Sequence, residues 1–235
     1  SNRAQEIAIQ KMQNTLEDAS ITAPVSGVVT AVYAKVGETG NGLLFVVEDT
    51  ESLKITTRIK EYDIANGPGI RFSLFVSGCT HHCDGCFNPE TWDFHYGSPY
   101  TQETEEELLE ALAPDYIRGL SLLGGEPMEP SNQRGLVGFL ERVKAELPGK
   151  TIWCFTGDLL EDLLDEANPR RTEVTDRMLA CIDVLVDGPY IKELHDISLR
   201  FRGSSNQRII DMPATRAACE VVPWVDDPVY ATHTM

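Results

Sequence analysis

Residues 71–94, RFSLFVSGCTHHCDGCFNPETWDF, decide both the expected fold and the expected chemistry. The stretch begins with an apolar run typical of a buried strand. It leads straight into three cysteines, Cys79, Cys83 and Cys86, in a C-x3-C-x2-C spacing. Three thiolates on one short loop can hold three irons of a [4Fe–4S] cluster. The fourth iron then has no protein ligand, so a small molecule can bind it.

The cysteine spacing leaves two other interpretations open. One is a zinc site in which His81 or His82 joins the three cysteines as the fourth ligand. Tetrahedral zinc sites usually take their ligands from two separate elements, and the sequence has no second C-x-x-C. The other interpretation is three unliganded thiols, so the spacing alone does not decide the chemistry.

The segments around and after the cysteines alternate between strand and helix patterns. Alternating strands and helices form βαβ units, so the pattern predicts an α/β domain with a parallel sheet whose first strand is 71–78. A helix over 103–112 is expected to begin at Thr101 or Thr104, because threonine caps helices and glutamates favour the first turn. Little periodicity follows Asp211. The remaining expected elements are strands at 119–125, 151–157 and 183–188, and helices near 131–146, 158–167 and 172–181.

The motif Gly124-Gly125-Glu126-Pro127 stands at the end of the strand that follows the cysteines. Ligands of α/β folds bind at the carboxyl ends of strands. Two glycines at such a position let a ligand approach the backbone closely. Alone, the motif is an ordinary strand-end turn. Combined with three cysteines at the end of the preceding strand, it favours a cofactor site built from both.

Composition narrows the classes of protein further. The chain of 235 residues carries a formal net charge of −17, from 37 acidic and 20 basic residues, which disfavours non-specific binding to nucleic acid or to an anionic membrane. No apolar run is long enough to span a bilayer, so no membrane insertion is expected. Six cysteines in a chain of this length do not make a disulfide scaffold. A site of reduced thiols needs a reducing compartment, and we expect a cytoplasmic protein.

Five stretches of the sequence together resemble one family. They are similar to the radical S-adenosylmethionine (SAM) superfamily and, more narrowly, to the activating proteins of the anaerobic ribonucleoside-triphosphate reductase. The cysteine triplet belongs to the whole superfamily, whereas NGPG at 66–69 and GSSNQR at 203–208 are specific to the narrower group. One departure is Gly85, where the superfamily often has an aromatic residue that packs on adenine; here Phe87 follows the third cysteine. The stretches that carry the resemblance are 63–94, 120–132, 151–157, 183–191 and 199–211.

The resemblance implies a fold, a reaction and partners. The implied fold is an incomplete (βα) barrel of radical SAM type with about five or six strands. The implied reaction is that of an oxidoreductase in which a reduced [4Fe–4S] cluster cleaves SAM to a 5′-deoxyadenosyl radical. That radical abstracts a hydrogen from a glycine Cα and so installs a glycyl radical on the large subunit of the anaerobic reductase. A flavodoxin-like protein is the implied electron donor.

The resemblance also assigns roles to individual residues. Cys79, Cys83 and Cys86 ligate the cluster and are catalytic, and the amino and carboxylate groups of SAM bind the open iron. His81 and His82 are expected to shape the loop without ligating iron. The expected SAM-binding residues are Gly124, Gly125 and Glu126 at the amino group of the methionine moiety, Thr156 and Gly157 along the nucleoside, and Asp187 at SAM or the target loop, unless Asp187 only forms a turn.

Residues 1–62 follow a different pattern. A helix is expected over 3–17, and β-branched runs cut by glycines predict short strands between 21 and 50 and at 53–60. This part resembles a fragment of the membrane-fusion (HlyD-like periplasmic adaptor) proteins, with the end of a helix, half of a lipoyl-like domain and the start of a β-domain. The expected division is therefore a partial adaptor fragment over 1–62 and a radical SAM domain over 63–235. A non-catalytic adaptor or assembly module is the alternative function from another class.

Overall fold

The computed structural model describes residues 28–32, 45–48, 54–56 and 62–226. The chain divides into two compact units, Ser1–Glu51 and Ser52–Met235. In the first unit, β1 (Val28–Val32) pairs antiparallel with β2 (Phe45–Glu48), within the segment for which short strands are predicted. The helix predicted over 3–17 lies outside the described residues. Within the described part of the chain, no helix combines the length and apolar character that crossing a bilayer requires.

The second unit is built on a mixed eight-stranded sheet with the order β10-β9-β8-β7-β5-β3-β6, while β4 pairs with β5. Its four central strands run parallel, as the alternating pattern predicts. These are β5 (Ile70–Val76), β7 (Ile117–Gly124), β8 (Thr151–Phe155) and β9 (Val184–Asp187). The antiparallel strands are β3 (Lys54–Thr56), β4 (Tyr62–Asp63), β6 (Ser98–Pro99) and β10 (Arg208–Asp211).

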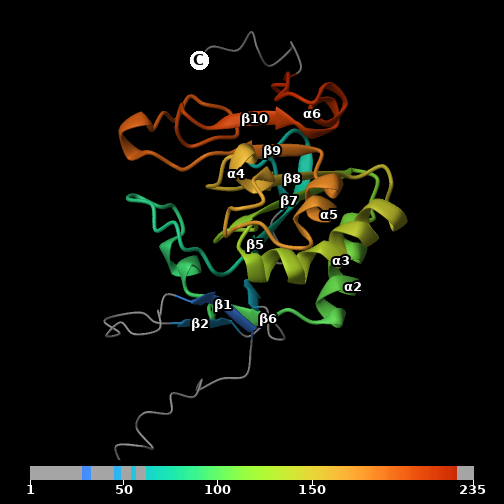
Figure 1. Cartoon of the computed structure of the whole chain (residues 1–235). Coiled ribbons are helices and arrows are strands. Elements are labelled where there is room, and N and C mark those ends of the chain that lie inside the picture. The colour runs from blue at the N-terminus through green and yellow to red at the C-terminus, as the bar shows by residue number, and fades with distance from the viewer. Residues whose placement is uncertain (1–27, 33–44, 49–53, 57–61, 227–235) are drawn as a thin grey trace, which may run out of the picture. The chain divides into compact units, whose positions relative to one another are not determined.

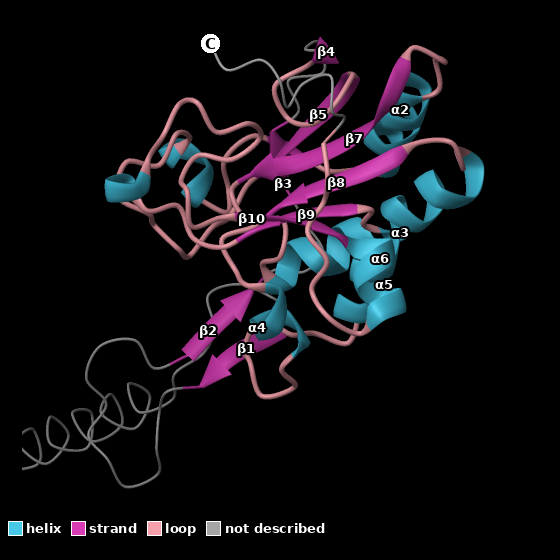
Figure 2. Cartoon of the chain, turned by 90° about the horizontal axis from the view of Figure 1, so that it is seen from above, coloured by secondary structure: helices cyan, strands magenta, loops and turns pink. Residues whose placement is uncertain are grey.

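Helices pack along one side of this sheet, as Figures 1 and 2 show. The inward residues of the central strands are fully buried, and the apolar stripes of the two longest helices cover them. The first helix begins with Thr101 as its cap, as predicted, in a capping box with Thr104. The helices are α2 (Gln102–Leu112), α3 (Pro130–Glu146), α4 (Leu160–Leu164), α5 (Thr175–Cys181) and α6 (Met212–Ala218), with short 3-10 turns η1 (Pro89–Trp92) and η2 (Lys192–Leu194).

The carboxyl-terminal half differs from the sequence pattern at two places. Helix α4 is shorter than the helix predicted over 158–167. The tail after Asp211 is also more regular than its weak periodicity indicates, because α6 begins at Met212 and follows an antiparallel strand, β10. A seven-residue helix makes only about two turns, too few to show a periodic pattern. Its start signals are nevertheless present: the Asp211 carboxylate accepts from the Ala214 amide at 2.9 Å, and Pro213 lies in the first turn.

The register of the parallel strands brings three loops to one edge of the sheet. Val76 at the end of β5 is level with Gly124 at the end of β7, and Phe155 at the end of β8 is level with Val186 of β9. The loops that follow these strands carry the cysteines, the Gly-Gly-Glu motif and the Thr156–Gly157 pair. Figure 2 shows the arrowheads of β7 and β8 pointing toward this group of loops. The fold therefore brings together segments that are far apart in sequence.

Candidate active site

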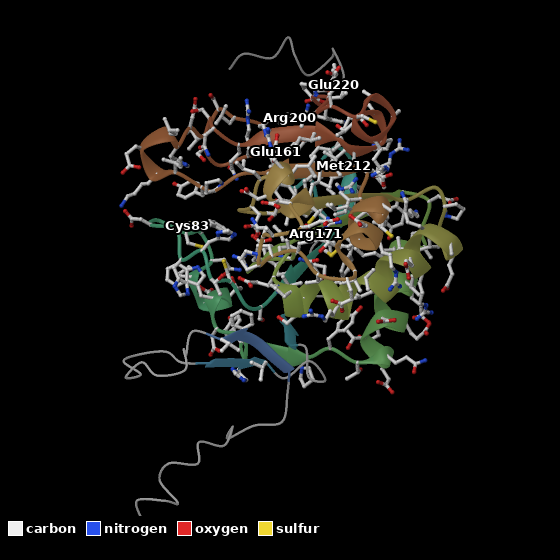
Figure 3. The ribbon with its side chains drawn as sticks, in the orientation of Figure 1. Cys83, Glu161, Arg171, Arg200, Met212 and Glu220 are labelled. Atoms are coloured by element: carbon white, nitrogen blue, oxygen red, sulfur yellow. The ribbon has the colours of Figure 1, made fainter. Side chains whose placement is uncertain are left out.

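A cavity of about 460 Å³ lies at the carboxyl ends of β5, β7 and β8. This volume falls within the range of about 300–1,000 Å³ that is usual for small-molecule sites. Figure 3 shows Cys83 on the loop that follows β5. All of the predicted site residues except Asp187 line the cavity: Cys79, Cys83, Cys86, Gly124, Gly125, Glu126, Thr156 and Gly157.

The cluster loop, defined here as residues 79–86, is fixed at its base by backbone hydrogen bonds. The Gly78 amide donates to the carbonyl of Thr91 at 2.8 Å, and the Cys79 amide donates to that of Trp92 at 3.3 Å. All three cysteines are free thiols, with Cys79 buried and the other two half-buried. Burial raises the pKa of Cys79 to about 12, and the nearby Glu126 carboxylate adds to this shift. A metal that binds Cys79 therefore has to displace a proton.

The Gly-Gly-Glu turn packs directly on the base of the cluster loop. The Gly125 amide donates to the carbonyl of Val76 at 2.7 Å, and the Glu126 amide donates to that of Gly78 at 2.8 Å. A Cβ atom on Gly124 would lie 2.6 Å from the Val76 backbone, and one on Gly125 would lie 2.6 Å from the Gly78 carbonyl oxygen. Both glycines are therefore required by contacts with the protein's own backbone. Close approach of a ligand to them stays a prediction.

Comparisons with known proteins agree with this geometry. The family model described as "4Fe-4S single cluster domain" matches residues 65–210. An anaerobic ribonucleoside-triphosphate reductase-activating protein of Vibrio cholerae is 46% identical over 149 residues, which cover 63% of this chain and 91% of the relative. The protein of that name from Escherichia coli is 45% identical over 147 residues (62% and 90%), and the one from Haemophilus influenzae is 43% identical over 149 residues (63% and 91%).

The chain belongs to the anaerobic ribonucleoside-triphosphate reductase-activating protein family. This membership confirms the resemblance carried by the five stretches from residue 63 onward. It also confirms an iron–sulfur cluster as the cofactor, since the matching domain is named for one. The zinc interpretation and the adaptor interpretation are not favoured.

The donor set of the cluster loop fits an iron–sulfur cluster. Cys79, Cys83 and Cys86 are free thiols that line one cavity. Iron–sulfur clusters are held by cysteine thiolates, whereas a structural zinc site needs a fourth protein ligand. Among the described residues, the group of candidate metal ligands found close together is His81, Glu126 and Asp158, which contains no cysteine. We conclude that the donor set of this activating-protein chain fits the cluster.

The two histidines of the cluster loop have other partners. His81 Nε2 lies 3.1 Å from a Glu126 carboxylate oxygen and 3.5 Å from one of Asp158. Hydrogen bonds to Asp158 and Glu126 raise the pKa of His81 to about 10, so the imidazole is protonated at neutral pH and that nitrogen is not a free metal ligand. The His82 ring packs on Trp92 with 4.8 Å between ring centroids.

The Glu126 side chain joins the first two loops to the third. Only 1% of Glu126 is exposed, and its carboxylate accepts from the amides of Met128 and Gly157, each at 2.8 Å. With His81 on the same carboxylate, Glu126 ties the cluster loop to the end of β8. The sequence marks Glu126 as a ligand contact but gives no sign of this linking role.

Asp187 does not line the cavity. Its carboxylate is fully buried, pairs with Arg208 through two nitrogens and accepts from the Leu160 amide at 2.9 Å. Sequence reasoning missed several lining residues from the loop after β9. Two of them, Gly203 and Gln207, belong to the GSSNQR stretch, which carries the resemblance but is assigned no site role by it, and the other two, Tyr190 and His195, lie outside it.

Proposed function

We propose that this chain is a radical enzyme that uses a [4Fe–4S] cluster and SAM to install a glycyl radical on an anaerobic ribonucleoside-triphosphate reductase. One observation carries the proposal: three cysteines, a Gly-Gly-Glu turn and a Thr-Gly turn line a single cavity at the ends of three adjacent strands. The names of the relatives support it, since each is called an activating protein of that reductase.

In this proposal, Cys79, Cys83 and Cys86 hold the cluster and leave one iron open. When bound, the cluster and SAM supply a carbon-centred radical that removes a hydrogen atom from a glycine Cα. The residues of the chain bind and orient the cluster and SAM. The Glu126 carboxylate has capacity for a further hydrogen bond and faces the cavity, so we assign it, with Gly124 and Gly125, to the ammonium group of SAM. Thr156 and Gly157 are assigned to the nucleoside.

The cavity walls serve to keep water from the reacting atoms. Phe75, Leu123 and Phe155 supply apolar surface beside the cysteines. Exclusion of water by an apolar wall strengthens the electrostatic interactions that hold the bound cofactors in place. Asp187 acts in this proposal as a positioning residue, because its contacts hold Arg208 and the start of α4 and do not reach the cavity.

The target glycine has to reach the cavity from outside. Phe87 lines the cavity and is 96% exposed, which places it at the mouth. We assign Phe87 to contact with the incoming segment of the large reductase subunit. We also propose a flavodoxin-like protein as the electron donor and the cytoplasm as the compartment. The proposed fold class is a partial (βα) barrel, and the proposed catalytic domain spans 63–235. The requirement for reduced thiols supports the compartment, and the parallel strands β5, β7, β8 and β9 support the fold.

The test is anaerobic reconstitution of the chain with iron and sulfide, followed by reduction and addition of SAM. We expect four irons to bind per chain, as the proposed cluster requires, and 5′-deoxyadenosine to form. With the large reductase subunit present, a glycyl radical should appear in its electron paramagnetic resonance spectrum. An intact cluster that yields no 5′-deoxyadenosine, or a chain that purifies anaerobically with zinc and without iron, would contradict the proposal.

A further inference from the structure

A second buried acid lies three residues after Glu126. Glu129 is 2% exposed, and one of its carboxylate oxygens accepts from both the backbone amide and the hydroxyl of Thr80, each at 2.7 Å. Thr80 immediately follows Cys79, the most buried of the three cluster cysteines. Glu129 therefore holds the cluster loop directly beside a cluster ligand, from the residue that precedes α3.

Arg170 completes this contact from a third segment of the chain, between α4 and α5. Its guanidinium pairs with Glu129, lies 3.3 Å from Asp158 and donates to the Thr80 hydroxyl at 2.8 Å. The Arg170 side chain is only 14% exposed. Glu129, Arg170 and Thr80 together form what we call the loop clamp.

The loop clamp acts on a strained piece of backbone. His82 has a φ of +48°, in the left-handed region that a residue with a Cβ atom adopts only at an energetic cost. Such strain persists only where the surroundings hold the backbone in place, and the bonds from Thr80 to Glu129 do so two residues before His82.

Stability alone does not account for the charge on Glu129. A buried ion pair is weak support for a fold, because apolar residues of similar volume are often as stabilising. Charge beside an iron–sulfur cluster has a separate effect, since net charge and hydrogen bonds to sulfur set its reduction potential. Glu129 supplies a charge next to the loop and holds the backbone amide of Thr80, the residue that follows Cys79.

We propose that Glu129 is a positioning residue which, through Thr80 and Arg170, fixes the cluster loop and lowers the reduction potential of the cluster. This inference rests on the proposed function, because a potential is defined only where the site holds a cluster. A low potential suits the reaction, since the electron has to be delivered to a sulfonium that accepts it with difficulty.

The experiment compares Glu129→Gln with Glu129→Ala. Glutamine keeps the oxygen that accepts from Thr80 but removes the charge and with it the ion pair with Arg170, so the loop should stay held through Thr80, the cluster should assemble, and its midpoint potential should become more positive. Alanine removes both the oxygen and the charge, so the cluster should be lost more easily. The chelator concentration that removes half of the iron should fall about tenfold or more. Glu173→Gln is the matched control: Glu173 pairs with Arg134 at 2.9 Å but is 66% exposed, and neither readout should change.

A third readout needs no iron. In the iron-free chain, hydrogen exchange at the Thr80 amide should be about tenfold faster in Glu129→Ala than in the wild type, because a net hydrogen bond of about 1.4 kcal/mol is lost. If the wild type assembles no cluster, the proposed function fails while this measurement still decides whether the clamp holds the loop.

The inference is overturned if both Glu129 variants retain iron and keep the midpoint potential of the wild type. If Glu129→Ala does not fold, as judged by its thermal unfolding, Glu129→Gln decides alone: a positive shift supports the proposal and an unchanged potential refutes it. Space filling by Glu129 would leave the potential of the isosteric glutamine variant unchanged.

Discussion

The two ends of the parallel strands both bury charged side chains, but the surroundings differ. Near the amino ends, Arg71 is 1% exposed and donates to neutral oxygens only: the hydroxyls of Ser121 and Thr151, each at 2.9 Å, and the backbone carbonyls of Leu120 and Thr151, at 2.7 and 2.8 Å. Its guanidinium also lies 5.6 Å from the centroid of the Trp153 ring. Near the carboxyl ends, three carboxylates share two cationic partners, and one of these pairs, Glu126 with His81, lines an open cavity.

This difference shows that buried charge does not by itself mark a functional site. Neutral acceptors and an aromatic face pack closely around Arg71, so Arg71 has a structural role at that end of the sheet. We refer to Arg71 together with these partners as the cap. At the other end, Glu126 and His81 line space that a ligand can fill, while Glu129, Asp158 and Arg170 do not line it. A charged pair that lines a cavity is what separates the active site from the cap.

The largest effect is expected at the carboxyl end, on changing a cluster ligand. Cys83→Ser should reduce cluster content and formation of 5′-deoxyadenosine to background, because three sulfur ligands are needed to hold the cube. Iron analysis and product chromatography measure both. Cys219→Ser is the control, since Cys219 is exposed and does not line the cavity. Full activity in Cys83→Ser would mean that the cavity is not the cluster site.

The next prediction concerns the cap, where a substitution should change the free energy of unfolding but not the rate of SAM cleavage. Arg71→Met should lower the free energy of unfolding by roughly 3 kcal/mol, because several buried oxygens lose their donor. Urea unfolding of the iron-free chain measures this, and SAM cleavage per folded molecule should stay within about twofold. Arg177→Met removes an exposed pair with Glu141 and should change stability by less than about 0.5 kcal/mol. Loss of chemistry with unchanged stability would contradict the comparison.

The sequence reveals the central strands because their apolar runs are continuous, as buried parallel strands require. It also reveals the cluster loop and the Gly-Gly-Glu turn, because their spacing is local. Pairings across the fold are not visible in this way. Arg208 reaches Asp187 only because β10 pairs antiparallel with β9. The sequence shows no periodic pattern that predicts β10. Asp187 is therefore predicted as a ligand contact but lies outside the cavity.

The loop clamp was missed for a similar reason. Glu129 lies between two prolines in the sequence EPMEP and has a visible signal as a second acid near Glu126, but its partner Thr80 lies on another loop. Arg170 belongs to an irregular segment with no motif at all. Such contacts depend on how the loops after β5, β7 and α4 meet, and that depends on the register of the sheet.

A smaller effect should separate binding of the reductase from the chemistry within the cavity. Phe87→Ala should lower the yield of glycyl radical about tenfold, as expected when an exposed aromatic anchor worth about 1.4 kcal/mol is removed. Cleavage of SAM in the absence of the reductase should remain within about twofold. Val225→Ala is the control, because Val225 is 82% exposed and does not line the cavity. Equal losses in both assays would place Phe87 in the cofactor site and not in docking.

The smallest expected effect concerns the contribution of Arg71 to the free energy of unfolding, which should not depend on pH near neutrality. Burial lowers the pKa of Arg71 to about 10, still above neutral, so the guanidinium stays protonated in the folded and unfolded chain from about pH 6 to 9. The difference in unfolding free energy between wild type and Arg71→Met should therefore be constant over that range. Above the folded pKa the unfolded chain binds more protons, so the wild type should gain stability relative to the variant as pH rises. A difference that shrinks on acidification would instead show that a carboxylate such as Asp183 supports Arg71, and the two ends of the sheet would then bury charge by the same means.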